Sequence, residues 1–207
     1  MSAAEAAIDD LLTAHSVASD GRRARSSASR SKIIRAMMEL IVEGDMNPSA
    51  ANTAKRAGVG LRTLFRLFED KDEIFRAVDA VLVAAYQPIV DAPYASDNWR
   101  GQLDELIERR CEVSEGIGPY RIATSAAGRQ SSFLRKNYRQ LHLAEKARLD
   151  AILPQEWQTA SSKGRAILVA TSFDTWRYLR QDEDLSEPET VAAIKQMVDD
   201  IVGEPVR

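Results

Sequence analysis

The sequence is poor in the residues that catalysis and disulfide bonds require. Among its 207 residues it has one cysteine, Cys111, and two histidines, His15 and His142. A single cysteine excludes an internal disulfide and a cysteine-rich zinc site, and it fits a reducing compartment. The sequence also lacks a glycine-rich phosphate loop, a Gly-x-Ser-x-Gly motif and metal-spaced His or Cys residues. We therefore predict no catalytic residue, no metal site and no cofactor, and a protein that is not an enzyme.

Long apolar runs are missing as well. No segment approaches the roughly 18 consecutive apolar residues of a membrane span. The first residues carry Glu5, Asp9 and Asp10, where a signal peptide needs positive charge. Hydrophobic residues make up 44% of the chain and charged residues 29%, a composition typical of a globular protein in water. We therefore expect a cytoplasmic protein with no membrane partner.

What the sequence does have is helical periodicity. No strand pattern persists after Val83, and successive segments repeat their apolar residues every three or four positions. We expect helices near residues 71–91, 98–114, 120–127, 131–153, 162–182 and 187–202. The glycine and proline residues of the 116–119 segment are expected to separate two of them. The predicted fold class is all-α.

The most informative segment runs from residue 49 to residue 74. Two short helical patterns flank Gly58-Val59-Gly60, where glycine permits a tight reversal, and Asp70 with Glu73 forms a capping box that opens a third helix at Lys71. This arrangement is typical of a helix-turn-helix that reads DNA. An ordinary amphipathic surface helix with a solvated basic face has the same spacing.

The second helix of this segment has two faces. One face is an apolar stripe with the spacing i, i+3, i+4 and i+7, formed by Leu61, Leu64, Phe65 and Phe68. We expect this stripe to anchor the helix. Arg62, Thr63 and Arg66 lie on the other side, where they are available to bind a partner.

Positive charge is concentrated around this helix. Ten basic and three acidic residues lie between Gly21 and Arg66, a local net charge of +7, whereas the whole chain carries −3. The basic residues are Arg22, Arg23, Arg25, Arg30, Lys32, Arg35, Lys55, Arg56, Arg62 and Arg66. A cationic region on an acidic protein attracts the phosphate backbone of DNA.

Residues 29–83 resemble the tetracycline-repressor (TetR) family of bacterial transcription regulators. Three runs carry the resemblance: the apolar pattern of residues 33–41, Thr53-Ala54-Lys55-Arg56-Ala57-Gly58-Val59, and residues 63–71 with the sequence TLFRLFEDK. The resemblance implies a homodimer with two N-terminal DNA-binding heads and a helical body that binds a small ligand and dimerises. The domains expected are a flexible, partly basic arm over residues 1–28, a helix-turn-helix head over 29–75, and an effector-binding and dimerisation body over 76–207.

The resemblance also assigns residues to the DNA interface. Leu61, Arg62 and Thr63 would face base edges, and Lys71 would meet a phosphate. Two positions depart from the family pattern. Phe65 replaces a usual tyrosine and loses its hydroxyl contact to phosphate, which leaves a packing role, and Gly60 replaces a better capping residue.

Side-chain chemistry supports several of these assignments independently. Arg62 can donate two hydrogen bonds to guanine, although a phosphate contact or a solvated arginine is an alternative, and the methyl group of Thr63 can pack on a thymine methyl. Arg66 lies one turn further on and suits a phosphate. Ser49 can cap the first reader helix, contact a phosphate, or do both. Arg30, among the basic residues before the motif, is also assigned to DNA.

The Ser-, Arg- and Gly-rich stretch over residues 19–31 completes the arm. It can lie in the minor groove or along the DNA backbone, and a solubilising tail would have the same composition.

The body carries weaker signals. Val191, Ile194, Val198 and Ile201 recur with helical spacing in the last helix, and Ser186 with Glu189 forms another capping box. The last two helices can form half of a dimeric four-helix bundle or pack within one chain. A ligand pocket is expected among the middle helices, although each aromatic residue there can equally be core. The candidate residues are Tyr120, Arg121, Phe133, Tyr138, His142, Trp157 and Trp176.

Together these features predict a sequence-specific transcriptional regulator. Its partners would be a palindromic double-stranded DNA operator, an unknown small-molecule effector that releases a repressor from it, and a second copy of the chain bound through the last two helices. The alternative is a helical protein-interaction module whose head no longer binds DNA.

Overall fold

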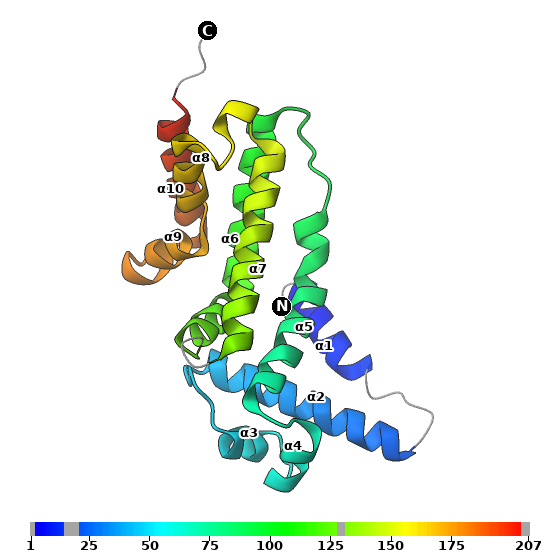
Figure 1. The fold of residues 1–207 in the computed structure, drawn as a ribbon. Coiled ribbons are helices and arrows are strands. Elements are labelled where there is room, and N and C mark those ends of the chain that lie inside the picture. The colour runs from blue at the N-terminus through cyan, green and yellow to red at the C-terminus, as the bar shows by residue number, and fades with distance from the viewer. Residues whose placement is uncertain (1–2, 15–20, 128–130, 204–207) are drawn as a thin grey trace. The chain divides into compact units, whose positions relative to one another are not determined.

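A computed structural model describes residues 3–14, 21–127 and 131–203, and this part of the chain is helical with no strand (Figure 1). Its α-helices are α1 (Ala3–Ala14), α2 (Gly21–Val42), α3 (Ala50–Arg56), α4 (Leu61–Leu67), α5 (Lys71–Asp91), α6 (Trp99–Ala127), α7 (Ser132–Ile152), α8 (Ser162–Ala170), α9 (Phe173–Arg177) and α10 (Glu187–Val202). The all-α prediction is confirmed for these residues. Within them, none of the helices combines the length and apolar character that crossing a membrane requires.

The chain divides into two compact units. Unit 1 comprises residues 1–88 and 116–137, and unit 2 comprises residues 89–115 and 138–207. Helices α5, α6 and α7 each contribute residues to both units.

Unit 1 is built around α2. Ile33, Met37 and Ile41 are spaced four residues apart on one face of α2 and are buried. Helices α1, α3 and α4 all contact α2. An ion pair of 2.6 Å between Arg35 and Asp9 also joins α1 to α2. This apolar face of α2 is what fixes the position of α3 and α4.

The expected flexible arm is largely helical, so that prediction was wrong for residues 21–28 and for the 21–31 part of the Ser- and Arg-rich stretch. Helix α2 begins at Gly21, and α1 occupies Ala3–Ala14. The Ser29 hydroxyl donates to the Arg25 carbonyl oxygen at 2.9 Å, four residues back in the same helix. Serine hydroxyls can be satisfied in this way inside a helix, and arginine and alanine favour helix. Residues 15–20 lie outside the described part of the chain.

Helix α5 begins at Lys71 as predicted, because the Asp70 carboxylate accepts from the Glu73 N–H at 2.8 Å. A line of polar side chains on α5 then holds the start of α7 within unit 1. The Ser131 hydroxyl donates to Asp72 at 2.7 Å, and the Asn137 amide donates to Asp79 at 3.0 Å. Burial raises the pKa of the Asp79 carboxyl, although its hydrogen bond from Asn137 opposes the shift.

Helix α6 runs without a break through residues 116–119, so the predicted interruption was wrong. Gly116 lies against the buried side chain of Tyr86, and a Cβ atom at Gly116 would stand 1.6 Å from the tyrosine hydroxyl. Glycine is needed there for close packing and not for a turn. The buried Tyr120 and Ala123 of the following turn explain why packing overrides the weak helix propensity of glycine and proline.

In unit 2 the predicted helix over residues 162–182 is divided. Helix α8 ends at Ala170, α9 begins at Phe173, and one π-helical turn follows over Tyr178–Asp182. The Ser172 hydroxyl accepts from the Thr175 N–H at 3.3 Å and so caps a new helix. Helix α10 begins after Ser186 as predicted, where Glu189 accepts from the Ser186 N–H at 2.8 Å.

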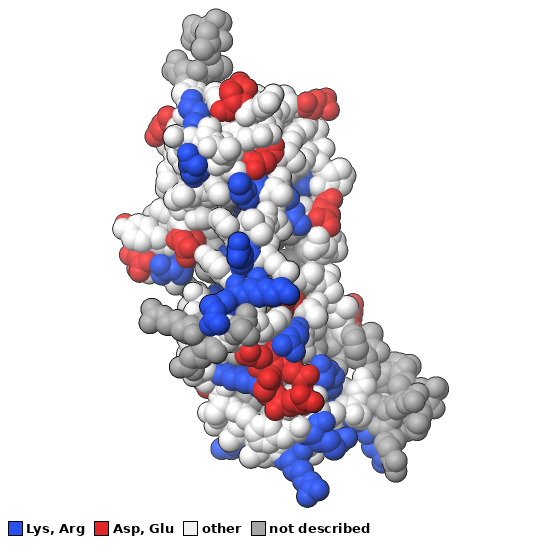
Figure 2. All heavy atoms as spheres, in the orientation of Figure 1, with Lys and Arg blue, Asp and Glu red and all other residues white. Residues whose placement is uncertain are grey.

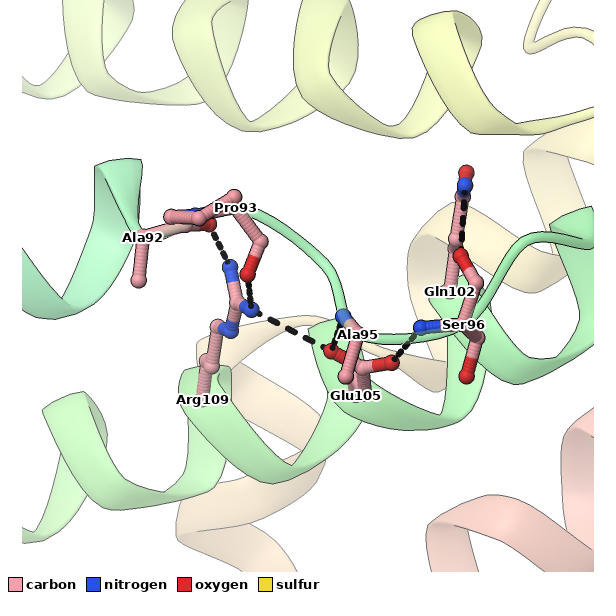
Figure 3. Close-up of polar contacts among 7 residues, drawn as sticks. All are labelled: Ala92, Pro93, Ala95, Ser96, Gln102, Glu105 and Arg109. Carbon is pink, nitrogen blue, oxygen red and sulfur yellow. Dashed lines mark hydrogen bonds and ion pairs between the residues drawn. The ribbon is translucent and has the colours of Figure 1, made fainter.

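The loop between α5 and α6 is held by side chains of α6 (Figure 3). The Glu105 carboxylate accepts from the N–H groups of Ala95 at 3.0 Å and Ser96 at 2.8 Å. These bonds lower the pKa of the Glu105 carboxyl. One turn later, Arg109 donates to the Pro93 carbonyl oxygen at 2.7 Å and pairs with Glu105 at 3.2 Å. We refer to Glu105 and Arg109 as the loop clip.

Candidate nucleic-acid interface

The turn between α3 and α4 depends on one glycine. Gly58 has a φ of +65°, a conformation that other residues adopt only with strain. In this turn the Gly58 N–H donates to the Lys55 carbonyl oxygen at 3.2 Å, and the Val59 N–H donates to that of Ala54 at 3.0 Å. These bonds satisfy the last carbonyl groups of α3 and direct the chain straight into α4.

Ser49 and Gly60 open the two short helices. The Ser49 hydroxyl accepts from the Asn52 N–H at 3.1 Å, so it caps α3. Gly60 stands at the N-cap of α4 with φ −69° and ψ 146° and supplies no side-chain bond. Ser49 therefore has a structural role in the free protein, whereas its predicted phosphate contact stays a prediction.

Helix α4 is held by one narrow edge. Leu64 and Phe68 are buried. Arg30 of α2 lies 4.2 Å from the centre of the Phe68 ring and donates to the Leu67 carbonyl oxygen at 3.0 Å, which satisfies the end of α4. Arg30 was predicted as a DNA contact, and the structure gives it this second task of fastening α4 to α2.

The prediction that all four apolar residues anchor α4 was wrong for two of them. Leu61 is 44% exposed and Phe65 is 52% exposed. The reason is geometric: α4 has only seven residues, and its buried edge is rotated from the centre of the apolar stripe toward Leu67. The packing role expected for Phe65 is therefore wrong as well.

The exposed surface of α4 consists of two columns, each with i, i+4 spacing. Leu61 and Phe65 form an apolar column, and Arg62 and Arg66 form a cationic column beside it, with both arginines exposed. We call these four residues the reading face. Thr63, predicted to face a base, is half-buried at the margin of this face.

Ion pairs reduce the charge that the basic region presents. Arg56 binds Glu43 at 2.5 Å and Glu39 at 3.3 Å, and Arg35 binds Asp9. The hydrogen bonds that Arg56 donates to Glu43 hold the pKa of Arg56 above its usual range. Lys55, next to Arg56 in sequence, is exposed. Figure 2 shows basic side chains at the end of unit 1 where Figure 1 has α4, with acidic side chains beside them.

Lys71 is half-buried at the first position of α5. Its ammonium group contacts the Asn47 amide oxygen and lies 5.4 Å from the centre of the Phe75 ring. Burial lowers the pKa of Lys71, and the carboxylates of Asp45 and Asp72 oppose that shift. The amine is thus held against Asn47 and the Phe75 ring.

The residues predicted for a ligand pocket are distributed over both units. Tyr120, Arg121 and Phe133 belong to unit 1, whereas Tyr138, His142, Trp157 and Trp176 belong to unit 2. Tyr120 is buried, which raises its pKa to about 12. Tyr138 is 54% exposed on α7 and His142 is exposed one turn later. Phe133 is half-buried and lies under the guanidinium of Arg76, 4.5 Å from its ring centre.

Trp176 does line a small cavity in unit 2. The other lining residues are Ile107, Arg110, Cys111, Ser114, Thr171, Ser172 and Ile194. The cavity measures about 10 Å³, which is room for about one water molecule, whereas ligand pockets usually enclose about 300 to 1,000 Å³. This cavity is therefore too small for an organic effector.

Sequence reasoning missed the polar cluster beside this cavity. Glu115 accepts from the indole N–H of Trp176 at 2.9 Å and from Arg180 at 2.7 Å. These partners are more than 60 residues apart from Glu115, so no local pattern indicates their contact. Burial, with a smaller effect from Glu115, raises the pKa of Cys111 to about 11, as expected of a structural thiol.

Comparisons with known proteins found no match to this chain among family models, curated proteins or solved structures. Functional assignment therefore depends on the residues and geometry described above.

Proposed function

We propose that this protein is a sequence-specific DNA-binding transcriptional regulator of the TetR type. The observation that carries the proposal is the reading face of α4. Leu64 and Phe68 fasten the helix by one edge, and Arg62, Arg66, Leu61 and Phe65 are left exposed on the other side. A helix presented in this way by a tight turn suits the major groove, which is about 12 Å wide.

Each basic residue around α4 has a task in this proposal. Arg62, in the first turn, donates to guanine O6 and N7. Arg66 and Lys55 are exposed and contact phosphates, and Lys71 contacts a third phosphate from its fixed position at the start of α5. Phosphate contacts set the orientation of the head, and base contacts select the sequence.

The regulator is proposed to act as a homodimer through α8 and α10. Val169 on α8 is 65% exposed, a large apolar side chain that a second copy would cover. Two heads related by a two-fold axis would bind a palindromic operator with half-sites about 34 to 36 Å apart. A small-molecule effector that favours another spacing of the heads would release the DNA. The water-sized cavity beside Trp176 is not its binding site.

A helical protein-interaction module is the second candidate function. The exposed apolar column of α4 favours it, because Leu61 and Phe65 would also suit a protein partner. The cationic column beside them favours DNA. Salt dependence separates the two candidates, since only DNA binding releases several condensed counterions.

Selection of bound sequences from random DNA duplexes tests the proposal. Purified full-length protein at near-physiological salt should enrich a palindromic motif, and affinity for that motif should fall steeply as salt increases. If a folded dimer enriches no motif, the DNA-binding proposal fails and the interaction module takes its place.

A further inference from the structure

We infer that Leu61 and Phe65 read thymine methyl groups. Each operator half-site would then carry two thymines about two base pairs apart, beside the guanine read by Arg62. This inference rests on the proposed DNA-binding function and specifies which bases the head selects. It concerns the apolar column, to which helical periodicity assigned an anchoring role, although the family resemblance also placed Leu61 at base edges.

The first argument is exposure. Leu61 and Phe65 are 44% and 52% exposed, on a helix of seven residues that is anchored by the buried Leu64 and by the buried Phe68 directly after its last residue. Two large apolar side chains that are exposed side by side leave apolar surface in contact with water. A partner that covers this surface removes it from water, which favours binding. The structure therefore presents a small apolar strip on the side of α4 that is free of α2.

The second argument is chemical complementarity. Arg62 and Arg66 run alongside the apolar strip, so the occupant must offer anionic or acceptor groups next to apolar ones. The major groove of DNA does this: guanine offers two acceptors, phosphates line the groove, and the C5-methyl group of thymine is the apolar group on a base edge. Phe65 has no hydroxyl to donate to phosphate, and its ring suits a thymine methyl.

The third argument is spacing. Residues four apart in an α-helix are separated by about 6 Å along its axis, and stacked base pairs are about 3.4 Å apart. With α4 lying along the groove, Leu61 and Phe65 would therefore reach methyl groups about two base pairs apart. Arg62, adjacent to Leu61, would reach a guanine within one base pair of the first thymine.

Replacing thymine by deoxyuridine tests the inference, because this change removes only the methyl group. In the selected operator, one substitution at either of two positions per half-site should weaken binding about fourfold, the value of one buried methyl group. Leu61→Ala and Phe65→Ala should each abolish the difference between thymine and uracil at one position and preserve it at the other. Both variants should keep the wild-type salt dependence.

Val83→Ala is a matched control, because Val83 is also exposed, at 51%, but lies on α5. It should leave the uracil penalty unchanged. Circular dichroism checks that the variants are folded, which is expected because the truncated side chains are exposed. Equal affinity for thymine and uracil duplexes at every position would overturn the inference while leaving the proposed function intact, as would a selected motif without thymine there. Absence of any selective DNA binding would overturn both.

Discussion

Lys55 and Arg56 are consecutive basic residues of α3 with different surroundings, and their replacement should affect DNA binding differently. Lys55 is exposed, whereas Arg56 is bound by two carboxylates, at 2.5 Å by Glu43 and at 3.3 Å by Glu39. In the proposed complex Lys55 can neutralise a phosphate. Arg56 already has counter-charges from the protein and should release few ions from DNA.

The size of the effect follows from the number of phosphate contacts. With Lys55, Arg66 and Lys71 each on one phosphate, two heads neutralise about six. The logarithm of the binding constant should then fall with the logarithm of salt concentration with a slope of about −5, or roughly a thousandfold between 50 and 200 mM. Lys55→Ala removes one contact per head and should flatten the slope to about −3.5. Arg56→Ala should leave it near −5.

Fluorescence anisotropy of a labelled operator duplex, titrated at four or five salt concentrations, measures these slopes. The wild-type protein, both variants and a scrambled duplex would be compared at one temperature and pH. A larger flattening for Arg56→Ala than for Lys55→Ala would refute the reasoning from the ion pairs. A wild-type slope near zero would refute phosphate binding by this region altogether.

Four further predictions concern single positions. Arg62→Ala should cost about 1 to 3 kcal/mol on the operator and relax selection at one base pair, measured by competition among single-base variants; unchanged discrimination would remove Arg62 from base reading. Gly60→Ser should raise the free energy of unfolding by a few tenths of a kcal/mol, because serine is a better N-cap residue than glycine. The backbone of residue 60 already has N-cap geometry, and no atom lies closer than 4.0 Å to a Cβ atom added there. Urea denaturation of both proteins measures the difference. Asp79→Asn should raise the melting temperature at pH 7. Burial raises the folded-state pKa of Asp79, so the wild-type protein loses stability as pH rises through that pKa. The asparagine of the variant carries no charge and still accepts a hydrogen bond from Asn137. A wild-type protein that is more stable than the variant at pH 7 would contradict this prediction. Cys111, with a pKa of about 11, should react with iodoacetamide at pH 8 roughly a hundredfold more slowly in the folded protein than in denaturant, and equal rates would show that the thiol is not protected.

Sequence periodicity predicted the long helices well where a local start signal accompanies a broad apolar face. Helix α5 begins after the capping Asp70, and α10 begins after Ser186, both as expected. The same rules wrongly divided α6 into two helices at residues 116–119. Gly116 is required there by its close contact with Tyr86, which lies far away in the sequence. Local residue preferences therefore failed where tertiary packing decides.

The candidate site could also be predicted only in part from the sequence. Glycine chemistry and helical spacing predicted the α3 to α4 turn, and the structure has Gly58 at a positive φ in it. Periodicity could not predict that Leu61 and Phe65 are exposed. It identifies which residues share a face of α4, but how that face is rotated toward α2 depends on contacts such as Arg30 with Phe68. Pairings within unit 2, such as Glu115 with Arg180, likewise have no local signal.

The loop clip changes how mutational tolerance should be distributed along the chain. The conformation of the loop between α5 and α6 is specified by Glu105 and Arg109, which bind its backbone, and the Arg109 guanidinium also lies 4.4 Å from the centre of the Tyr94 ring. Ala95 can vary in identity, because any residue other than proline offers the same N–H group. Inserting or deleting one residue would misalign every bond of the clip. Substitution of Ala95 should be silent, changes of the loop's length should be costly, and the strongest constraint on the loop's shape should be found on α6, outside the loop itself.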